Sequence, residues 1–371
     1  MKLIQIAFIF LLLVVPVYSQ QTAEDWYSKG DLLLNLGKYN ESIDAYNKAI
    51  ELNQSYAVAW SHKGSALFNL SLYNESLKCY NKAIELDSKL APPWSGKGAV
   101  FANFGKYEEA IKACDEAIRL DPNLAKAWYN KGRVLSMQGN YGEAIKAYDE
   151  AIRLDPKYIV VWISKGGALY NQGKYEEAIN ACDEAIKLNS SNPSCWDIKG
   201  MALMEQGKYD EVVKAYDQAI KLKPSNPGYR NNKGNALYSL GKYDESVKAY
   251  DQAIKLDSSD PVYWSNKGNT LDKLGKYDEA IKSYSKASEI DANITTSMLT
   301  KGNSHYNAGE YVAAIRYYDE AIIQDPKDEY AWYNKAMALR MLHRDSEAKA
   351  AYTKARELGY SGTMTLMEMT T

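Results

Sequence analysis

The chain has 371 residues, of which 46% are hydrophobic and 25% are charged, and its net charge at pH 7 is -2. Its 45 basic residues are spread among 47 acidic ones, whereas a nucleic-acid surface needs clustered cations without matching acids, so we expect no nucleic-acid partner. The length alone would allow two or three domains.

Residues 1–19 differ from the rest of the chain. A short basic start leads into an apolar run, Leu3–Tyr18, and Val17 and Ser19 occupy the -3 and -1 places for cleavage before Gln20. This arrangement is typical of a secretory signal peptide. The run is shorter than the roughly 20 residues that a membrane-spanning helix needs, although its retention as a membrane anchor is the alternative. We expect a secreted or cell-surface protein.

From residue 23 onwards the sequence repeats every 34 residues. Each copy has a Lys followed by Gly, or by Ala in the last copy, at Gly30, Gly64, Gly98, Gly132, Gly166, Gly200, Gly234, Gly268, Gly302 and Ala336. A fixed period of this length indicates one supersecondary unit copied head to tail. The sequence therefore predicts an array over residues 20–362, with ten repeats from residue 23, and a tail over 363–371. It favours an extended functional surface over a pocket in one core.

The fourth copy shows the pattern of one repeat. Trp128, Gly132 and Leu135 recur at steps of four and three, as on one face of a helix. After a break at Gly139 a second apolar pattern runs to Leu154, and the Pro that follows two residues later cannot continue a helix. Each repeat is therefore predicted to be a helical hairpin.

Small residues are expected where the two helices of a hairpin touch. The second helix has Ala at one place in all ten copies, from Ala49 to Ala355, and another small residue at the place of Ala144. We expect both places to face the Gly of the first helix. A Gly within a helix costs about 1 kcal/mol relative to Ala, so its repetition suggests a contact too tight for a methyl group.

Trp, Gly, Tyr, Ala, a second aromatic, Ala and Pro at these offsets make the chain similar to the tetratricopeptide repeat (TPR) family. The resemblance implies an all-α fold, a right-handed α-solenoid of ten helix-turn-helix units. It also implies that the first helices line a concave groove that holds peptides or partner proteins. The tenth copy departs from the pattern with Ala336, His343 and Asp345, as expected for a polar terminal cap.

A second departure is the Lys before each Gly, from Lys29 to Lys335, where the family usually has Leu. An anion-binding row is one interpretation. We favour a Lys whose methylene stem packs and whose ammonium reaches water or a carboxylate, because an Asp recurs with the same period at Asp87, Asp121, Asp155, Asp257, Asp291 and Asp325. Acid-first pairs four residues apart are expected on the second helices, at Asp115 and Arg119, Asp149 and Arg153, Asp217 and Lys221, and Asp251 and Lys255.

The sequence has no pattern that indicates catalysis. His62, His305 and His343 lie in different copies at different repeat places, so they are not expected to share a metal. HExxH, GxSxG, EF-hand and phosphate-loop spacings are missing from the sequence. We expect no enzyme activity, no cofactor and no metal site.

By the resemblance, groove-facing side chains lie at the second, fifth, ninth, twelfth and thirteenth places of each repeat. The candidate peptide-binding residues are Tyr129, Arg133, Tyr170, Asn171, Met204, Asn235, Tyr238, Asn269, Asn303 and Tyr306, beside Asp197, Met201, Asn231 and Asn307. Tyr and Asn suit a neutral or mixed peptide segment better than a highly charged one. The family's carboxylate clamp needs a basic residue at the fifth place, which no copy has.

Four cysteines show no CxxC pattern, and only Cys182 and Cys195 are candidates for a disulfide. Export would also expose sequons to glycosylation, although so short a motif often arises by chance. Their acceptors are Asn40, Asn53, Asn69, Asn74, Asn189 and Asn293.

The sequence therefore predicts an exported, non-enzymatic scaffold that binds proteins or peptides in its groove. The alternative is a structural spacer that associates with itself in a cell-surface or extracellular assembly. Membrane contact is expected only if the leader stays in place as an anchor.

Overall fold

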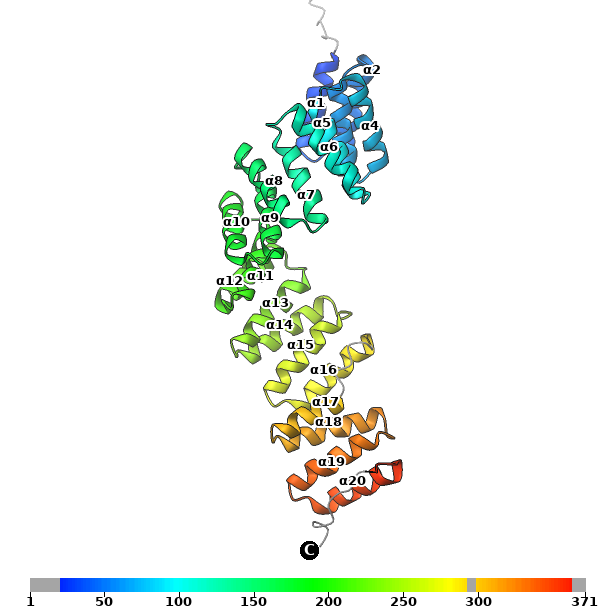
Figure 1. Cartoon of the computed structure of the whole chain (residues 1–371), viewed down its shortest axis with the longest axis vertical. Coiled ribbons are helices and arrows are strands. Elements are labelled where there is room, and N and C mark those ends of the chain that lie inside the picture. Colours follow the sequence, from blue (N-terminus) through cyan, green and yellow to red (C-terminus); the bar gives the residue numbers. More distant parts are fainter. Residues whose placement is uncertain (1–20, 292–297, 362–371) are drawn as a thin grey trace, which may run out of the picture. The chain divides into compact units, whose positions relative to one another are not determined.

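The structure is a computed structural model that describes residues 21–291 and 298–361. In these residues it has twenty helices, paired into helix-turn-helix units as predicted (Figure 1). The first helices of the ten repeats are α1 (Ala23–Asn35), α3 (Ala57–Asn69), α5 (Ala91–Asn103), α7 (Ala125–Met137), α9 (Ile159–Asn171), α11 (Pro193–Glu205), α13 (Pro227–Ser239), α15 (Pro261–Lys273), α17 (Met298–Asn307) and α19 (Glu329–Met341). The second helices are α2 (Tyr39–Leu52), α4 (Tyr73–Leu86), α6 (Tyr107–Leu120), α8 (Tyr141–Leu154), α10 (Tyr175–Leu188), α12 (Tyr209–Leu222), α14 (Tyr243–Leu256), α16 (Tyr277–Ile290), α18 (Tyr311–Gln324) and α20 (Asp345–Leu358).

The predicted leader, the tail and the sequon at Asn293 lie outside the described residues. The described chain divides into two compact blocks between Ala168 and Leu169, within α9. We call residues 21–168 the N-terminal block and 169–361 the C-terminal block. Within each block, contacts join mainly neighbouring helices, as expected for stacked repeats.

A left-handed residue joins the two helices of a hairpin. Gly139 has φ 76°, and Gly occupies this place in eight of the ten repeats. Ser71 and His343 hold the same place with φ 62° and 57°. Because a residue without a Cβ adopts positive φ at little cost, the repeated Gly fixes where the first helix ends.

The Gly at the eighth place of a repeat lies against the side chain at the twenty-fourth place of the same repeat, which is a Tyr in most repeats. A Cβ added to Gly268 would lie 2.6 Å from Cε1 of Tyr284, and at Gly98 it would meet Cys114 Sγ at the same distance. The small residue at the twentieth place also faces the Gly, since Ser246 Oγ donates a hydrogen bond to the Gly234 carbonyl at 2.8 Å.

The prediction for the tenfold Ala was wrong, because these residues lie at the contact with the next repeat. Ala49 shares a buried cluster with Ala59, and Ala321 shares one with Ala331. A small side chain at this place lets the second helix approach the first helix of the following repeat.

Trp and Lys connect most first helices to the repeat before them. Trp128 Nε1 donates a hydrogen bond to the Pro122 carbonyl at 3.0 Å, and the Lys131 ammonium lies 5.8 Å from the centre of the Trp128 ring. That ammonium also lies 2.7 Å from the Asp115 carboxylate of the preceding repeat. Equivalent ion pairs join Lys165 to Asp149, Lys199 to Asp183, Lys233 to Asp217, Lys267 to Asp251 and Lys335 to Asp319.

In these six repeats the Lys is therefore a packed stem with a paired ammonium, but the predicted carboxylate partner was wrong. Asp121 instead accepts a hydrogen bond from the Asn123 backbone N–H at 3.0 Å, just after α6 ends. Asp87, Asp155, Asp257 and Asp325 do the same.

The expected pairs four residues apart were also wrong. Arg119 bonds Glu116 at 2.6 Å, three residues away, because Asp115 is already held by Lys131. Arg153 likewise pairs with Glu150.

Cys182 and Cys195 are both buried as free thiols. Burial raises the pKa of Cys182 to about 12 and that of Cys195 to about 11, which disfavours the reactive thiolate. Both cysteines act as small core side chains.

Candidate functional site

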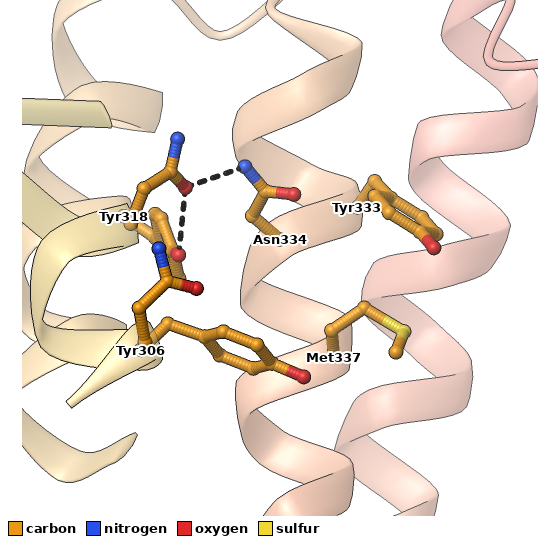
Figure 2. A pocket seen from close by; sticks show the side chains of 7 residues that line it. Tyr306, Tyr318, Tyr333, Asn334 and Met337 are labelled. Atoms are coloured by element: carbon orange, nitrogen blue, oxygen red, sulfur yellow. Dashed lines mark hydrogen bonds between the residues drawn. The ribbon is translucent and has the colours of Figure 1, made fainter. Parts of the chain in front are cut away.

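A pocket of about 380 Å³ lies on the face formed by α17 and α19 (Figure 2). Asn303 and Tyr306, two of the predicted groove residues, line it together with Tyr333 and Met337. These side chains come from the ninth and twelfth places of one repeat and the fifth and ninth places of the next. The structure therefore brings predicted groove residues together in this part of the C-terminal block.

The amide of Asn303 is held in one orientation by the protein. Its Oδ1 accepts hydrogen bonds from the Tyr318 hydroxyl at 2.9 Å and from Asn334 Nδ2 at 2.8 Å, drawn as dashed lines in Figure 2. Among the described residues, its Nδ2 donates no hydrogen bond.

The same arrangement recurs in the two preceding repeats. Asn235 Oδ1 accepts from the Tyr250 hydroxyl at 2.7 Å and from Asn266 Nδ2 at 3.3 Å. Asn269 Oδ1 accepts from the Tyr284 hydroxyl at 2.9 Å and from Lys301 Nζ at 3.1 Å. An ammonium can only donate, so the oxygen of Asn269 must face it.

Three asparagines, Asn235, Asn269 and Asn303, thus have occupied oxygens and unused amide N–H groups in the described structure; we call them the amide row. The buried tyrosine behind each one stays protonated, as shown by Tyr250, whose pKa burial raises to about 12. Because each oxygen is already used, the row can offer hydrogen-bond donors but few acceptors.

The tyrosines at the twelfth place are braced within their own repeats. Tyr306 packs on Tyr311 and Tyr238 packs on Tyr243, both with ring centres 5.4 Å apart, and Tyr170 packs on Tyr175 at 5.7 Å. This contact fixes one side of each ring.

A second pocket, of about 460 Å³, includes Tyr238 and Asn269 of the predicted set. Tyr170, Asn171, Met204 and Asn235 line neither of these two pockets. Asn231 is buried, with Nδ2 directed to Asn232.

The second pocket also contains a polar cluster that the sequence analysis missed. His305 Nε2 lies 3.1 Å from Asp272 Oδ1, and His305 Nδ1 lies 2.6 Å from Glu310 Oε2. The Tyr317 hydroxyl donates to Asp272, and Lys301 Nζ lies 3.7 Å from the same carboxylate. We call His305, Asp272, Glu310 and Tyr317 the His305 cluster.

The His305 cluster stabilises a charged imidazole. The Asp272 hydrogen bond raises the pKa of His305 against the effect of burial, and Glu310 adds to the rise. Burial alone would raise the pKa of Asp272, but hydrogen bonds from His305 and Tyr317 outweigh it and lower that pKa. With carboxylates at both ring nitrogens, His305 is expected to donate from both.

Comparison of equivalent places in the ten repeats could have revealed this cluster. His305 occupies the eleventh place, where the other nine repeats have Leu or Phe, and Tyr317 occupies a place otherwise held by Ala, Cys or Ser. Glu310 stands where seven repeats have Lys or Arg. Residues of one repeat that depart from the repeat pattern therefore meet in space, next to Asp272 of the preceding repeat.

Tyr129 and Arg133, the other predicted groove residues, lie on α7 in the N-terminal block. Tyr129 packs against Tyr158 with ring centres 5.4 Å apart. Arg133 Nη2 donates to the Ala99 carbonyl at 3.3 Å.

The sequon residues Asn40, Asn53, Asn69, Asn74 and Asn189 are all exposed. Within the described residues, no group of three His, Cys, Asp or Glu side chains is arranged to hold a metal ion. None of the described helices combines the length and apolar character needed to cross a bilayer.

Protein-family models match most of the chain. A model described as "TPR repeat" matches residues 30–71, 104–139, 200–241 and 234–275. Two models described as "Tetratricopeptide repeat" match residues 57–90, 125–158, 159–192 and 261–293, and residues 299–361. Comparison with curated protein sequences finds no significant match.

Solved structures with similar folds cover about half of this chain. YrrB, described as a TPR protein with an unusual peptide-binding site, is 22% identical with a TM-score of 0.44, over 48% of this chain and 92% of its own. MamA from residue 41 to its end, from Desulfovibrio magneticus RS-1, is 20% identical with a TM-score of 0.44, over 46% and 96%. Another MamA structure is 25% identical with a TM-score of 0.36, over 46% and 93%.

Proposed function

Because the chain belongs to the tetratricopeptide repeat family, we propose that it is a non-enzymatic scaffold that binds extended peptide segments on the first helices of its C-terminal block. The amide row supports this proposal most directly. Asn235, Asn269 and Asn303 present N–H groups whose orientation the protein has already fixed. An extended peptide offers unpaired backbone carbonyls that match such donors.

Two features of the pockets support a peptide as the ligand. Tyr306, Tyr333 and Met337 add apolar and aromatic surface beside Asn303, so side chains of the ligand can pack while its backbone is hydrogen bonded. The donors need no reorientation before binding, which reduces the entropy that a peptide complex must overcome.

Substitution of Asn by Asp in the amide row tests the proposal. The Asp carboxylate keeps an oxygen for the tyrosine hydroxyl but removes the N–H donors and repels a carbonyl. We would select binders to the purified chain from a random library of 12-residue peptides and measure their affinities. Asn269→Asp with Asn303→Asp should weaken binding about tenfold or more, whereas Asn180→Asp on the exposed surface of α10 should not.

Failure to enrich any peptide would contradict the proposal. Self-association that increases with concentration, measured by sedimentation of the free chain, would then favour the structural spacer. Equal binding by the Asn269→Asp, Asn303→Asp chain would exclude the amide row as the contact surface.

We also propose that the chain is exported and acts at the cell surface or outside the cell. Support comes from the leader-like residues 1–19 and from five sequons whose Asn side chains are exposed. Amino-terminal sequencing of the native protein should give a chain that begins at Gln20. A chain that retains residues 1–19 would instead support the anchored alternative.

A further inference from the structure

One face of α7, in the N-terminal block, has two cations without anionic partners. Lys126, Tyr129 and Arg133 lie three and four residues apart and so share this face. At 1.5 Å per residue, the two cations are about 10 Å apart along the helix axis. We call this surface the α7 face.

The second to fourth repeats have no acid at the groove-facing places around the α7 face. Between residues 57 and 168, Lys126 and Arg133 are the only charged residues at the second, fifth, ninth, twelfth and thirteenth repeat places, whereas the first repeat has Glu24 and Asp31 there. In the described structure neither lies within ion-pair distance of a carboxylate. Lys131 on the same helix shows the contrast, since Asp115 lies 2.7 Å from its ammonium.

Arg133 is incompletely hydrogen bonded. Its Nη2 reaches the Ala99 carbonyl, but Nε is buried and has no hydrogen-bond partner among the described residues. A cationic group in this condition gains more from an anionic ligand than a fully solvated one, because part of its desolvation cost has already been met.

Lys126 faces a concave surface. It lines a pocket of about 500 Å³ together with Ser61, Ser65 and Ser95. Its side chain is exposed, and the atoms around its ammonium lower the pKa of that group.

We propose that the α7 face binds an acidic stretch of a peptide ligand, with Asp or Glu side chains directed to Lys126 and Arg133. The inference rests on the proposed peptide-binding function. It adds that the ligand segment bound by the N-terminal block is acidic. Tyr129 lies between the two cations and is braced by Tyr148 and Tyr158, so it offers a fixed ring for the intervening residues.

The same random 12-residue library tests this inference, using chain produced in bacteria so that Asn69 beside Lys126 carries no glycan. Peptides selected by the unmodified chain should be enriched in Asp and Glu. Lys126→Met with Arg133→Met should abolish this enrichment and lower the affinity for a selected acidic peptide about tenfold. Replacing the acidic residues of that peptide by Gln or Asn should weaken its binding to the unmodified chain similarly.

The matched control is Lys146→Met with Arg153→Met, which removes the same two residue types from exposed pairs with Glu143 and Glu150 in the same block. This control should bind the acidic peptide as the unmodified chain does. If both double variants bound the acidic peptide equally weakly, the net charge of the chain alone would explain the loss of affinity. That result would overturn the inference.

The outcomes separate the inference from the function on which it rests. Enriched peptides without excess acid, or undiminished binding to the Lys126→Met, Arg133→Met chain, would overturn the acidic-ligand inference alone. A library that yields no binder would overturn both.

Discussion

The contact between a Gly and a buried Tyr fixes how closely the helices of one repeat approach. Gly268 and Tyr284 show the contact, because a Cβ on the Gly would lie 2.6 Å from a ring that is 1% exposed. The tenth repeat has Ala336 in place of the Gly, and its ring, Tyr352, is only half-buried.

Gly268→Ala should therefore destabilise the chain although Ala is the better helix former. Overpacking a filled site costs about 1–3 kcal/mol, which exceeds the gain of about 1 kcal/mol in helix propensity. The midpoint of urea unfolding should fall. Gly228→Ala is the control, since among the described residues only Asn226 Oδ1, at 3.2 Å, would lie close to its added Cβ. A higher midpoint for Gly268→Ala would show that the ring moves aside freely.

At the scale of helices, the junction between α15 and α17 is built differently from the others. Met298 replaces the Trp of eight repeats, and Ser285 replaces the Asp that pairs with the Lys at six other junctions. Lys301 turns instead towards Asn269 and Asp272. The His305 cluster therefore supplies polar contacts where the usual ones are missing.

This junction should weaken at alkaline pH. The folded chain raises the pKa of His305, so its stabilising contribution is complete below about pH 6.5, the unfolded value, and is lost as the pH rises through the folded pKa. The folded chain lowers the pKa of Asp272, so that contribution is present above about pH 3.9 and is lost on acidification through the folded pKa. The unmodified chain should exceed the His305→Leu chain in free energy of unfolding by more at pH 5.5 than at pH 8.5.

Two measurements check this pH dependence. Urea unfolding at both pH values gives the stability difference, and NMR titration of His305 should show a pKa above 6.5. Asp272→Asn removes the main cause of the raised pKa and should lower the pKa of His305. Parallel stability curves for the unmodified and His305→Leu chains would contradict the assignment.

The helices could be predicted from the sequence because their signals are local. Apolar spacing, Gly139 at the turn and Pro156 after the last helical turn each act within a few residues. The ion pair between Lys131 and Asp115 could not be predicted, because it joins different helices. A pair within one helix, between Asp115 and Arg119, was equally plausible from the sequence. Asn269 was predicted to line a groove, but the tyrosine that orients it lies fifteen residues away.

At the scale of the whole molecule, stability is distributed between neighbours. Within each block, most described helices pack mainly on the helices before and after them. In such an array a local defect should lower the stability of its own and adjacent repeats and leave distant ones unchanged. Because the chain forms two compact blocks, we also expect a defect in one block to leave the stability of the other block unchanged.

Asp272→Asn makes this locality measurable by hydrogen exchange. The substitution keeps the shape of the side chain but leaves His305 and Lys301 with less compensating charge, at a cost of about 1–3 kcal/mol. Amides of α15–α18 should exchange about fivefold to a hundredfold faster, while those of α1–α6 should not change. Asp210→Asn, on a carboxylate that is 72% exposed, is the control and should alter neither region. Faster exchange throughout the chain would instead show that the repeats unfold as a single cooperative unit.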